Sequence, residues 1–201
     1  MMKLGLDFDN TLIDYDEVFY EIAFKKNLIP KNIGKTKVEV RKYLKDKGRE
    51  KLFTLLQGEV YGSKISQAKQ SKGMFETLKK LKQQKIELFI VSHKTLYPYA
   101  GPKVDLHQAA LKWLTLNQFF DANQLDFKRE NVFFELTIES KIKRIESIGI
   151  THYVDDLTKI LELITPKIKR IHYNPKGDLS NINDILTLRS WEEIQQVLKG
   201  Y

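Results

Sequence analysis

Short apolar runs alternate with amphipathic segments along most of this 201-residue chain. Five runs have the length and composition of β-strands, namely Lys3–Phe8, Ile86–Val91, Asn131–Phe134, Thr151–Val154 and Ile168–Tyr173. Between and after these runs, apolar residues recur at the i, i+3, i+4 spacing of one helix face. They form four groups: Met74, Leu78 and Leu81; Val104, Ala109, Leu111 and Leu114; Ile142, Ile145 and Ile148; and Trp191, Ile194, Val197 and Leu198. Strands that alternate with helices predict an α/β fold with a parallel sheet covered by helices on both faces.

Residues 15–72 depart from this alternation and contain no convincing strand. Their pattern predicts three or four helices, over roughly Asp16–Leu28, Lys35–Lys47, Glu50–Tyr61 and Ile65–Gln70, separated by proline and glycine. Because the segment directly follows the first strand, we expect it to form a small helical cap over the end of that strand. The predicted domains are therefore a core of residues 1–14 and 73–201 and a cap of residues 15–72.

The composition narrows the class of protein. With 42% hydrophobic and 30% charged residues, the chain is typical of globular proteins and unlike disordered ones. It contains no cysteine, which excludes disulfides, thiolate zinc sites and cysteine nucleophiles. Asp7 and Asp9 interrupt the N-terminal apolar run where a signal peptide needs a continuous one, and no run has membrane-spanning length. We therefore expect a cytoplasmic protein with no membrane partner.

The net charge of +8 is unevenly distributed. Residues 1–24 carry a net charge of −5, residues 25–72 carry +10 and residues 73–201 carry +3. The basic middle segment has two interpretations that the sequence leaves open. It is either a solvated, lysine-rich surface or a basic lid that attracts an anionic substrate toward the acidic strand end.

The first strand ends in a cluster of carboxylates, in the sequence Asp7-Phe8-Asp9-Asn10-Thr11. Alternate residues of an extended chain point to the same side, so Asp7 and Asp9 share a side that Phe8 does not. Two carboxylates that emerge together repel each other, and a divalent cation or a shared proton makes the arrangement tolerable. This pattern favours phosphate chemistry at the end of the strand.

Three further features fall at predicted strand or helix ends. Ser92-His93-Lys94 follows the second strand, where a hydroxyl and backbone N–H groups suit a phosphoryl oxygen. Lys141 lies at the start of a predicted helix, from which its ammonium can point at a ligand. Asp155-Asp156 follows the fourth strand. Each has an ordinary structural interpretation as a turn former, a solvated lysine or a helix cap, but their combination at one sheet edge favours a shared site.

With these motifs in this order, the chain resembles the haloacid dehalogenase superfamily, in the phosphatase branch with a helical cap between the first two motifs. The resemblance covers the whole chain, with Asp7 to Thr11 as the first motif, Ser92 as the second, Lys141 as the third and Asp155-Asp156 as the fourth. It implies a Rossmann-like three-layer α/β/α core with strand order 5-4-1-2-3. Lys143 is a weaker candidate for the third motif because it lies one turn too far into the helix.

The resemblance also implies a reaction. Asp7 attacks the phosphorus of a phosphomonoester to form an aspartyl-phosphate, and Asp9 acts as general acid and then as general base. Mg²⁺ is held by Asp7, the backbone carbonyl of Asp9, and Asp155 or Asp156, without a choice between the last two. The phosphate-binding residues are Thr11, Ser92, His93, Lys94 and Lys141, of which Thr11 is expected to orient the loop that carries Asp9.

The sequence does not identify the leaving group of the reaction. We expect a small phosphorylated metabolite, either a sugar phosphate or a nucleotide, and a substrate-facing role for the aromatic loop 93–103 that follows the second motif. Two alternatives are a phosphatase that processes nucleic-acid ends with its basic cap, and a non-catalytic binding protein with the same fold. Mutase activity, which uses the same motifs, and the oligomeric state also stay open.

Overall fold

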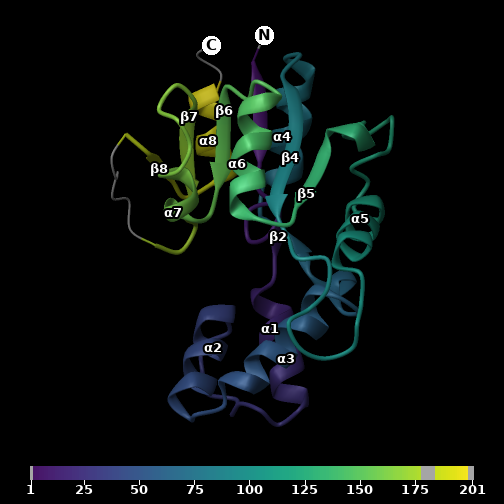
Figure 1. The fold of residues 1–201 in the computed structure, drawn as a ribbon, viewed down its shortest axis with the longest axis vertical. Helices are drawn as coiled ribbons and strands as arrows, with labels where there is room; N and C mark the ends of the chain where they lie inside the picture. Colours follow the sequence, from purple (N-terminus) through teal and green to yellow (C-terminus); the bar gives the residue numbers. More distant parts are fainter. Residues whose placement is uncertain (1, 178–183, 199–201) are drawn as a thin grey trace. The chain divides into compact units, whose positions relative to one another are not determined.

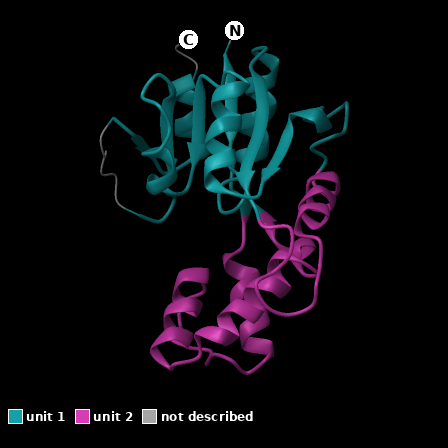
Figure 2. Cartoon of the chain, in the orientation of Figure 1, with its two compact units in different colours: residues 1–13, 70–94, 118–201 teal, residues 14–69, 95–117 magenta. Residues whose placement is uncertain are grey.

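The computed structural model describes residues 2–177 and 184–198, and it separates into two compact units (Figure 2). The first, called here the sheet unit, comprises residues 1–13, 70–94 and 118–201. The second, called the helical unit, comprises residues 14–69 and 95–117.

The sheet unit contains a parallel sheet of six strands among the described residues (Figure 1). The strands are β1 (Lys3–Leu6), β4 (Glu87–His93), β5 (Val132–Glu135), β6 (His152–Asp155), β7 (Lys169–Tyr173) and β8 (Leu186–Leu188), in the order β5-β4-β1-β6-β7-β8. The five predicted strands therefore follow the order 5-4-1-2-3 when read from the opposite edge, which confirms the predicted α/β fold. The edge strand β8 was not predicted, because a run of three residues gives too short a pattern.

Helices cover both faces of this sheet. On one face, α6 (Ile138–Ser147) and the short α7 (Thr158–Leu161) close a core that contains Val91, Ile145 and Tyr153. On the other face, α4 (Met74–Gln83) packs against α8 (Trp191–Leu198) (Figure 1). The Ser190 hydroxyl accepts a hydrogen bond from the Glu193 N–H at 3.2 Å, as expected for an N-cap. The result is the three-layer α/β/α arrangement that the sequence predicted.

The helical unit consists of α1 (Asp16–Lys25), α2 (Lys37–Asp46), α3 (Glu50–Tyr61), the 3₁₀ turn η1 (Ile65–Gln67) and α5 (Leu106–Leu116). Its core is aromatic: the buried Phe19 ring stacks on Phe53 with 5.5 Å between centroids. Two short strands, β2 (Ile13–Asp14) and β3 (Lys69–Gln70), pair where the chain passes between the units, and η2 (Arg129–Asn131) precedes β5 in the sheet unit. The segment expected to contain no strand thus ends in one two-residue strand.

The helical unit differs from the predicted cap by one added segment and by a few residues at the ends of the first one. Residues 95–117, which were predicted to belong to the core, pack within the helical unit, and its first segment is 14–69 instead of 15–72. The buried Trp113 Nε1 of α5 donates a hydrogen bond to the Ala68 carbonyl at 2.9 Å. Part of the predicted core, residues 178–183 and 199–201, lies outside the described residues. No helix in the described ranges has the length and apolar character needed to cross a bilayer.

Candidate active site

The candidate site lies at the carboxyl ends of three adjacent strands. Asp7 immediately follows β1, and its N–H donates to the Val154 carbonyl of β6 at 2.9 Å, which continues the strand pairing. Ser92 lies near the end of β4, and Asp155 is the last residue of β6. Since β4, β1 and β6 are parallel neighbours, their carboxyl ends bring these side chains to one edge of the sheet.

A buried lysine joins two of the carboxylates. Lys141 Nζ donates to Asp7 Oδ1 at 2.6 Å and to Asp155 Oδ2 at 2.7 Å, and the lysine is only 2% exposed. Its position is set by α6, which begins after the Thr137 N-cap, whose hydroxyl accepts from the Ser140 N–H. Lys143, two residues further, is exposed and pairs with Glu139 on the helix surface at 2.7 Å. Of the two lysines considered from the sequence, Lys141 therefore contacts the carboxylates.

The segment after β1 carries a second ion pair. Lys94 Nζ, which is buried, donates to both carboxylate oxygens of Asp9 at 2.8 Å. Ser92 Oγ donates to Asp7 Oδ1 at 2.9 Å. His93 Nε2 lies 3.2 Å from the Leu136 carbonyl. Ser92 and Lys94 thus reach the two acidic residues of the first motif, whereas the ring of His93 contacts the backbone after β5.

The fourth motif places its two aspartates differently. Asp155 is fully buried, and its Oδ1 accepts a hydrogen bond from the Leu157 N–H at 2.8 Å. Asp156 is half-buried, and its Oδ2 accepts from Asn10 Nδ2 at 3.1 Å. Asn10 adopts a left-handed conformation with φ +58°, which asparagine tolerates better than most residues. The turn after β1 therefore contacts the end of β6 through Asn10, a role that the sequence analysis did not assign.

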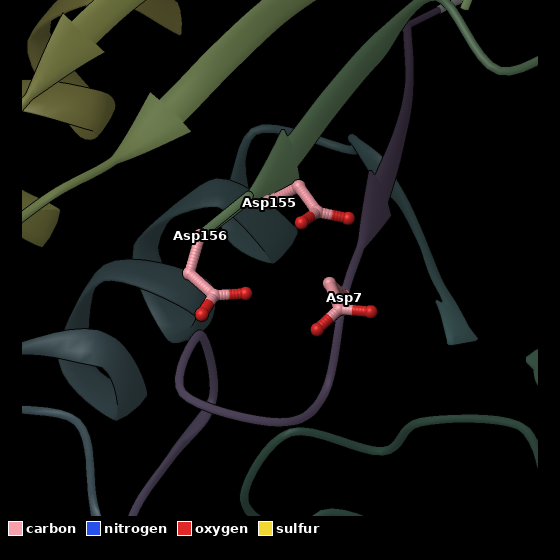
Figure 3. Close-up of side chains that lie close together, drawn as sticks. All are labelled: Asp7, Asp155 and Asp156. Carbon is pink, nitrogen blue, oxygen red and sulfur yellow. The ribbon is translucent and has the colours of Figure 1, made fainter. Parts of the chain in front are cut away.

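Three carboxylates from these segments face a common space, as Figure 3 shows. One oxygen each of Asp7, Asp155 and Asp156 lies within 4.8 Å of the others. Together with Asp9, they bring four carboxylates to an edge where Lys94 and Lys141 supply the two ammonium groups. Negative charge is thus in excess, and a cluster of oxygen ligands at this spacing fits a hard divalent cation such as Mg²⁺.

The crowding of charges changes the protonation of the site. Burial, reinforced by the neighbouring Asp7, raises the pKa of Asp155 to about 7, although Lys141 opposes this rise. Burial alone disfavours the charged form of Lys141, but the negative charge around it, first of all that of Asp7, raises its pKa well above the usual range. Lys141 therefore remains an ammonium, and the carboxylate cluster still lacks positive charge.

Three further residues lie in β1, in β6 or in the turn after β1. Thr11 is fully buried, and its Oγ1 has no hydrogen-bond partner within the described part of the chain. The buried Tyr153 hydroxyl donates to the Val91 carbonyl next to Ser92, and the Tyr153 ring lies 5.5 Å from Lys141 Nζ. Gly5 makes room for this ring, because a Cβ there would lie 2.6 Å from Tyr153 Cδ2. Neither Tyr153 nor Gly5 was expected to support the site, since both read as ordinary strand residues.

Comparison with solved structures identifies the fold. A HAD-superfamily hydrolase from Ehrlichia chaffeensis superimposes with a TM-score of 0.57 over 100% of this chain and 98% of that one, at 17% sequence identity. The chain has the haloacid dehalogenase-like fold. A HAD phosphatase from Thermococcus onnurineus shares this fold with a TM-score of 0.53 at 18% identity, over 100% of this chain and 99% of that one. A phosphoserine phosphohydrolase-like protein from Francisella tularensis gives 0.56 at 15% identity, over 98% and 100%.

Sequence comparison finds one curated relative of similar length. A Bacillus cereus protein named "Putative nucleotidase" is 26% identical over 207 residues, covering 98% of this chain and 98% of the relative. No family model matches the chain.

Proposed function

We infer that this protein is a Mg²⁺-dependent phosphomonoester hydrolase that acts through an aspartyl-phosphate. The observation that carries this proposal is the asymmetric setting of Asp7. Its Oδ1 accepts hydrogen bonds from both Ser92 and Lys141, whereas its Oδ2 has no hydrogen-bond partner among the described residues. One oxygen thus fixes the side chain, and the other is available to attack phosphorus.

In the first step, Asp7 Oδ2 forms a bond to phosphorus while the bond from phosphorus to the leaving oxygen breaks. Asp9, as the carboxylic acid, gives its proton to that oxygen and so becomes a carboxylate. In the second step, Asp9 takes a proton from water, whose oxygen displaces Asp7 and releases phosphate. Lys94 holds both oxygens of Asp9 and so fixes the direction of this carboxylate.

The remaining residues would bind the phosphate and offset its charge. A carboxylate and a phosphate oxygen ~4 Å apart repel by about 4 kcal/mol per pair of charges at an effective dielectric constant near 20. The third N–H of Lys141 and the N-terminal turn of α6 would donate hydrogen bonds to phosphoryl oxygens, and the Ser92 hydroxyl would do so on turning away from Asp7. Bound by Asp7, the Asp9 carbonyl, and Asp155 or Asp156, Mg²⁺ would supply further positive charge at the transferred group.

The proposed substrate is a small phosphorylated metabolite, and one finding supports a nucleotide over a sugar phosphate. The curated relative from Bacillus cereus is named as a nucleotidase and matches this chain over nearly its whole length.

The experiment that tests this proposal measures phosphate release from nucleoside monophosphates and sugar phosphates, with Mg²⁺ and with EDTA. We expect release to require Mg²⁺ and to fall by about 10³-fold or more in Asp7→Asn. Asp46→Asn, which changes an exposed aspartate of α2, should keep the activity of the unmodified protein. Release that persists in Asp7→Asn would contradict the proposal. If no metabolite is hydrolysed by folded protein, nucleic acids with phosphorylated ends are the next substrates to assay.

A further inference from the structure

Two hydrogen-bond donors fix the side chain of Asp7, and the buried Tyr153 contacts the segments that carry both of them. Ser92 Oγ and Lys141 Nζ donate to the same oxygen, Asp7 Oδ1, at 2.9 Å and 2.6 Å. Tyr153, the second residue of β6, reaches the backbone next to Ser92 with its hydroxyl and the Lys141 ammonium with its ring. The reaction proposed above gives Tyr153 no role.

The Tyr153 side chain crosses over β1. Strands β4 and β6 lie on opposite sides of β1, so they are separated by twice the ~4.8 Å spacing of neighbouring strands. In the register of the sheet, Tyr153 lies beside Gly5, and its hydroxyl donates to the Val91 carbonyl of β4. A phenol ring is long enough for this crossing and carries a donor at its far end. Tyr153 therefore connects three neighbouring strands.

Gly5 leaves room for this crossing. Its neighbours Leu4 and Leu6 are fully buried, as expected of a central strand, whereas a glycine weakens a strand and often marks the close approach of another group. A Cβ at Gly5 would lie 2.6 Å from Tyr153 Cδ2, closer than real contacts allow. The missing side chain of Gly5 therefore allows the Tyr153 ring to lie against β1.

The hydroxyl of Tyr153 restrains the backbone that carries Ser92. The Val91 carbonyl and the Ser92 N–H belong to one planar peptide group. A hydrogen bond to this carbonyl therefore limits the rotation of the whole group, and with it the direction in which Ser92 presents its side chain. Hydrogen bonds weaken steeply when they lose their alignment, so a rotation here would weaken the bond from Ser92 to Asp7.

The ring of Tyr153 restrains Lys141. A lysine side chain is long and flexible, and its ammonium group has no preferred direction of its own. Lys141 Nζ lies 5.5 Å from the centre of the Tyr153 ring, within the range of a cation–π contact. The same ammonium donates to Asp7 and Asp155. The ring thus adds an uncharged contact that keeps the ammonium at the two carboxylates.

We propose that Tyr153 is a positioning residue, which orients Asp7 for attack by restraining both of its hydrogen-bond donors. The proposal rests on the hydrolase function inferred above. Ser92 and Lys141 both bind Asp7 Oδ1, so a loss of restraint on either donor lets the carboxylate rotate and moves Oδ2 out of line with phosphorus. Tyr153 contacts neither phosphate nor metal in this scheme. Its loss should therefore lower kcat and leave KM nearly unchanged.

Kinetics of two Tyr153 variants test the proposal on the full chain, with the phosphomonoester that the protein hydrolyses best. Tyr153→Phe keeps the ring and removes the hydroxyl, and we expect kcat to fall about tenfold. Tyr153→Val removes both, and we expect a fall of about 100-fold. KM should change less than about twofold in either variant. Tyr173→Phe is the matched control and should keep kcat, because Tyr173 is a buried tyrosine of β7 whose ring packs against Trp191.

Gly5→Ala tests whether the position of the ring matters. The added Cβ displaces the Tyr153 ring without removing any hydrogen-bonding group, so kcat should fall about tenfold when Tyr153 is present. In the Tyr153→Val background the ring is gone, and Gly5→Ala should lower kcat less than about twofold. Equal losses of kcat in the two backgrounds would overturn the route through Tyr153.

NMR supplies a measurement that does not depend on hydrolysis. The Ser92 amide signal reports on the hydrogen bond to the Val91 carbonyl, and the Lys141 ammonium signal, assigned with Lys141→Met, reports on its contacts. We expect the first to shift in both Tyr153 variants and the second in Tyr153→Val, with neither changed in Tyr173→Phe. These shifts in a protein that releases no phosphate would support the restraint by Tyr153 and contradict the hydrolase function. An unchanged kcat in both Tyr153 variants of an active protein would overturn the positioning role and leave the hydrolase function intact.

Discussion

The strand-end site of the sheet unit differs most in charge from a cavity of the helical unit, which is lined by residues of α3 and of the loop after β4 such as Gln57, Tyr61 and Pro98. The former gathers four carboxylates and two lysines, whereas the latter is lined by no charged residue at all. Removing one partner of a buried ion pair leaves the other charge buried and unpaired, which strongly destabilises the folded protein. A neutral lining carries no such dependence. We therefore expect the stability of the strand-end site to change when a charged partner or a bound metal is removed. The cavity should change only when a substitution alters its shape or its hydrogen bonds.

The largest effect should come from Lys141→Met. This change leaves Asp7 and the fully buried Asp155 without their shared ammonium, and loss of one partner of a buried pair typically costs about 3–5 kcal/mol. Urea unfolding in the presence of EDTA, which removes any bound metal, should show this loss in the free energy of unfolding. In a Trp113→Phe background, fluorescence reports on the remaining Trp191, which lies in the sheet unit.

Lys143→Met is the matched control for this experiment. It removes an exposed lysine two residues away, whose i,i+4 pair with Glu139 lies in solvent and should contribute almost nothing to stability. If both variants lost the same free energy of unfolding, the buried ammonium of Lys141 would have no special role. The stability of the strand-end site would then not depend on its buried charges.

Metal binding should come next in size. If the carboxylate cluster holds Mg²⁺, then Mg²⁺ at 100 times its dissociation constant stabilises the folded protein by about 2.7 kcal/mol. Asp156→Asn should weaken this stabilisation, because it removes one of the three clustered carboxylates. Glu139→Gln, an exposed carboxylate of α6, should leave it unchanged. Thermal unfolding over a Mg²⁺ titration gives the comparison, and stabilisation that is the same in Asp156→Asn would exclude this aspartate as a ligand.

Lys94→Met should have a smaller effect on stability than Lys141→Met. Hydrogen bonds to charged groups contribute about 1.5–3 kcal/mol, and we expect the lower end here because the Asp9 side chain is 20% exposed and remains hydrated. Phosphate release should fall as well, because the Asp9 carboxylate is no longer fixed at both oxygens. Lys94→Arg, which retains paired donors, should recover part of that rate. If Lys94→Met lowered the free energy of unfolding as much as Lys141→Met, the partial exposure of Asp9 would not reduce the cost of losing its ion-pair partner.

The sequence predicted much of the sheet unit because its signals are local and strong. The strand–helix alternation predicted the five central strands, and the resemblance to the haloacid dehalogenase superfamily implied their order. The residues proposed for the site lie near strand ends or near the start of a helix. The pairing of Lys94 with Asp9 could not be predicted, since a lysine two residues after Ser92 reads equally well as a phosphate contact. Asn10 likewise reads as a turn residue, and its contact with Asp156 depends on how β1 and β6 lie beside each other.

The helical unit was harder to predict because its contacts join segments far apart in the chain. The apolar face of α5 indicates a helix but not its partner, and residues 95–117 were therefore assigned to the core by their position after β4. The bond from Trp113 to Ala68 spans 45 residues. Gly58 reads as a weak point in a helix, and only the close approach of Pro98 and Ala100 explains why a side chain does not fit there.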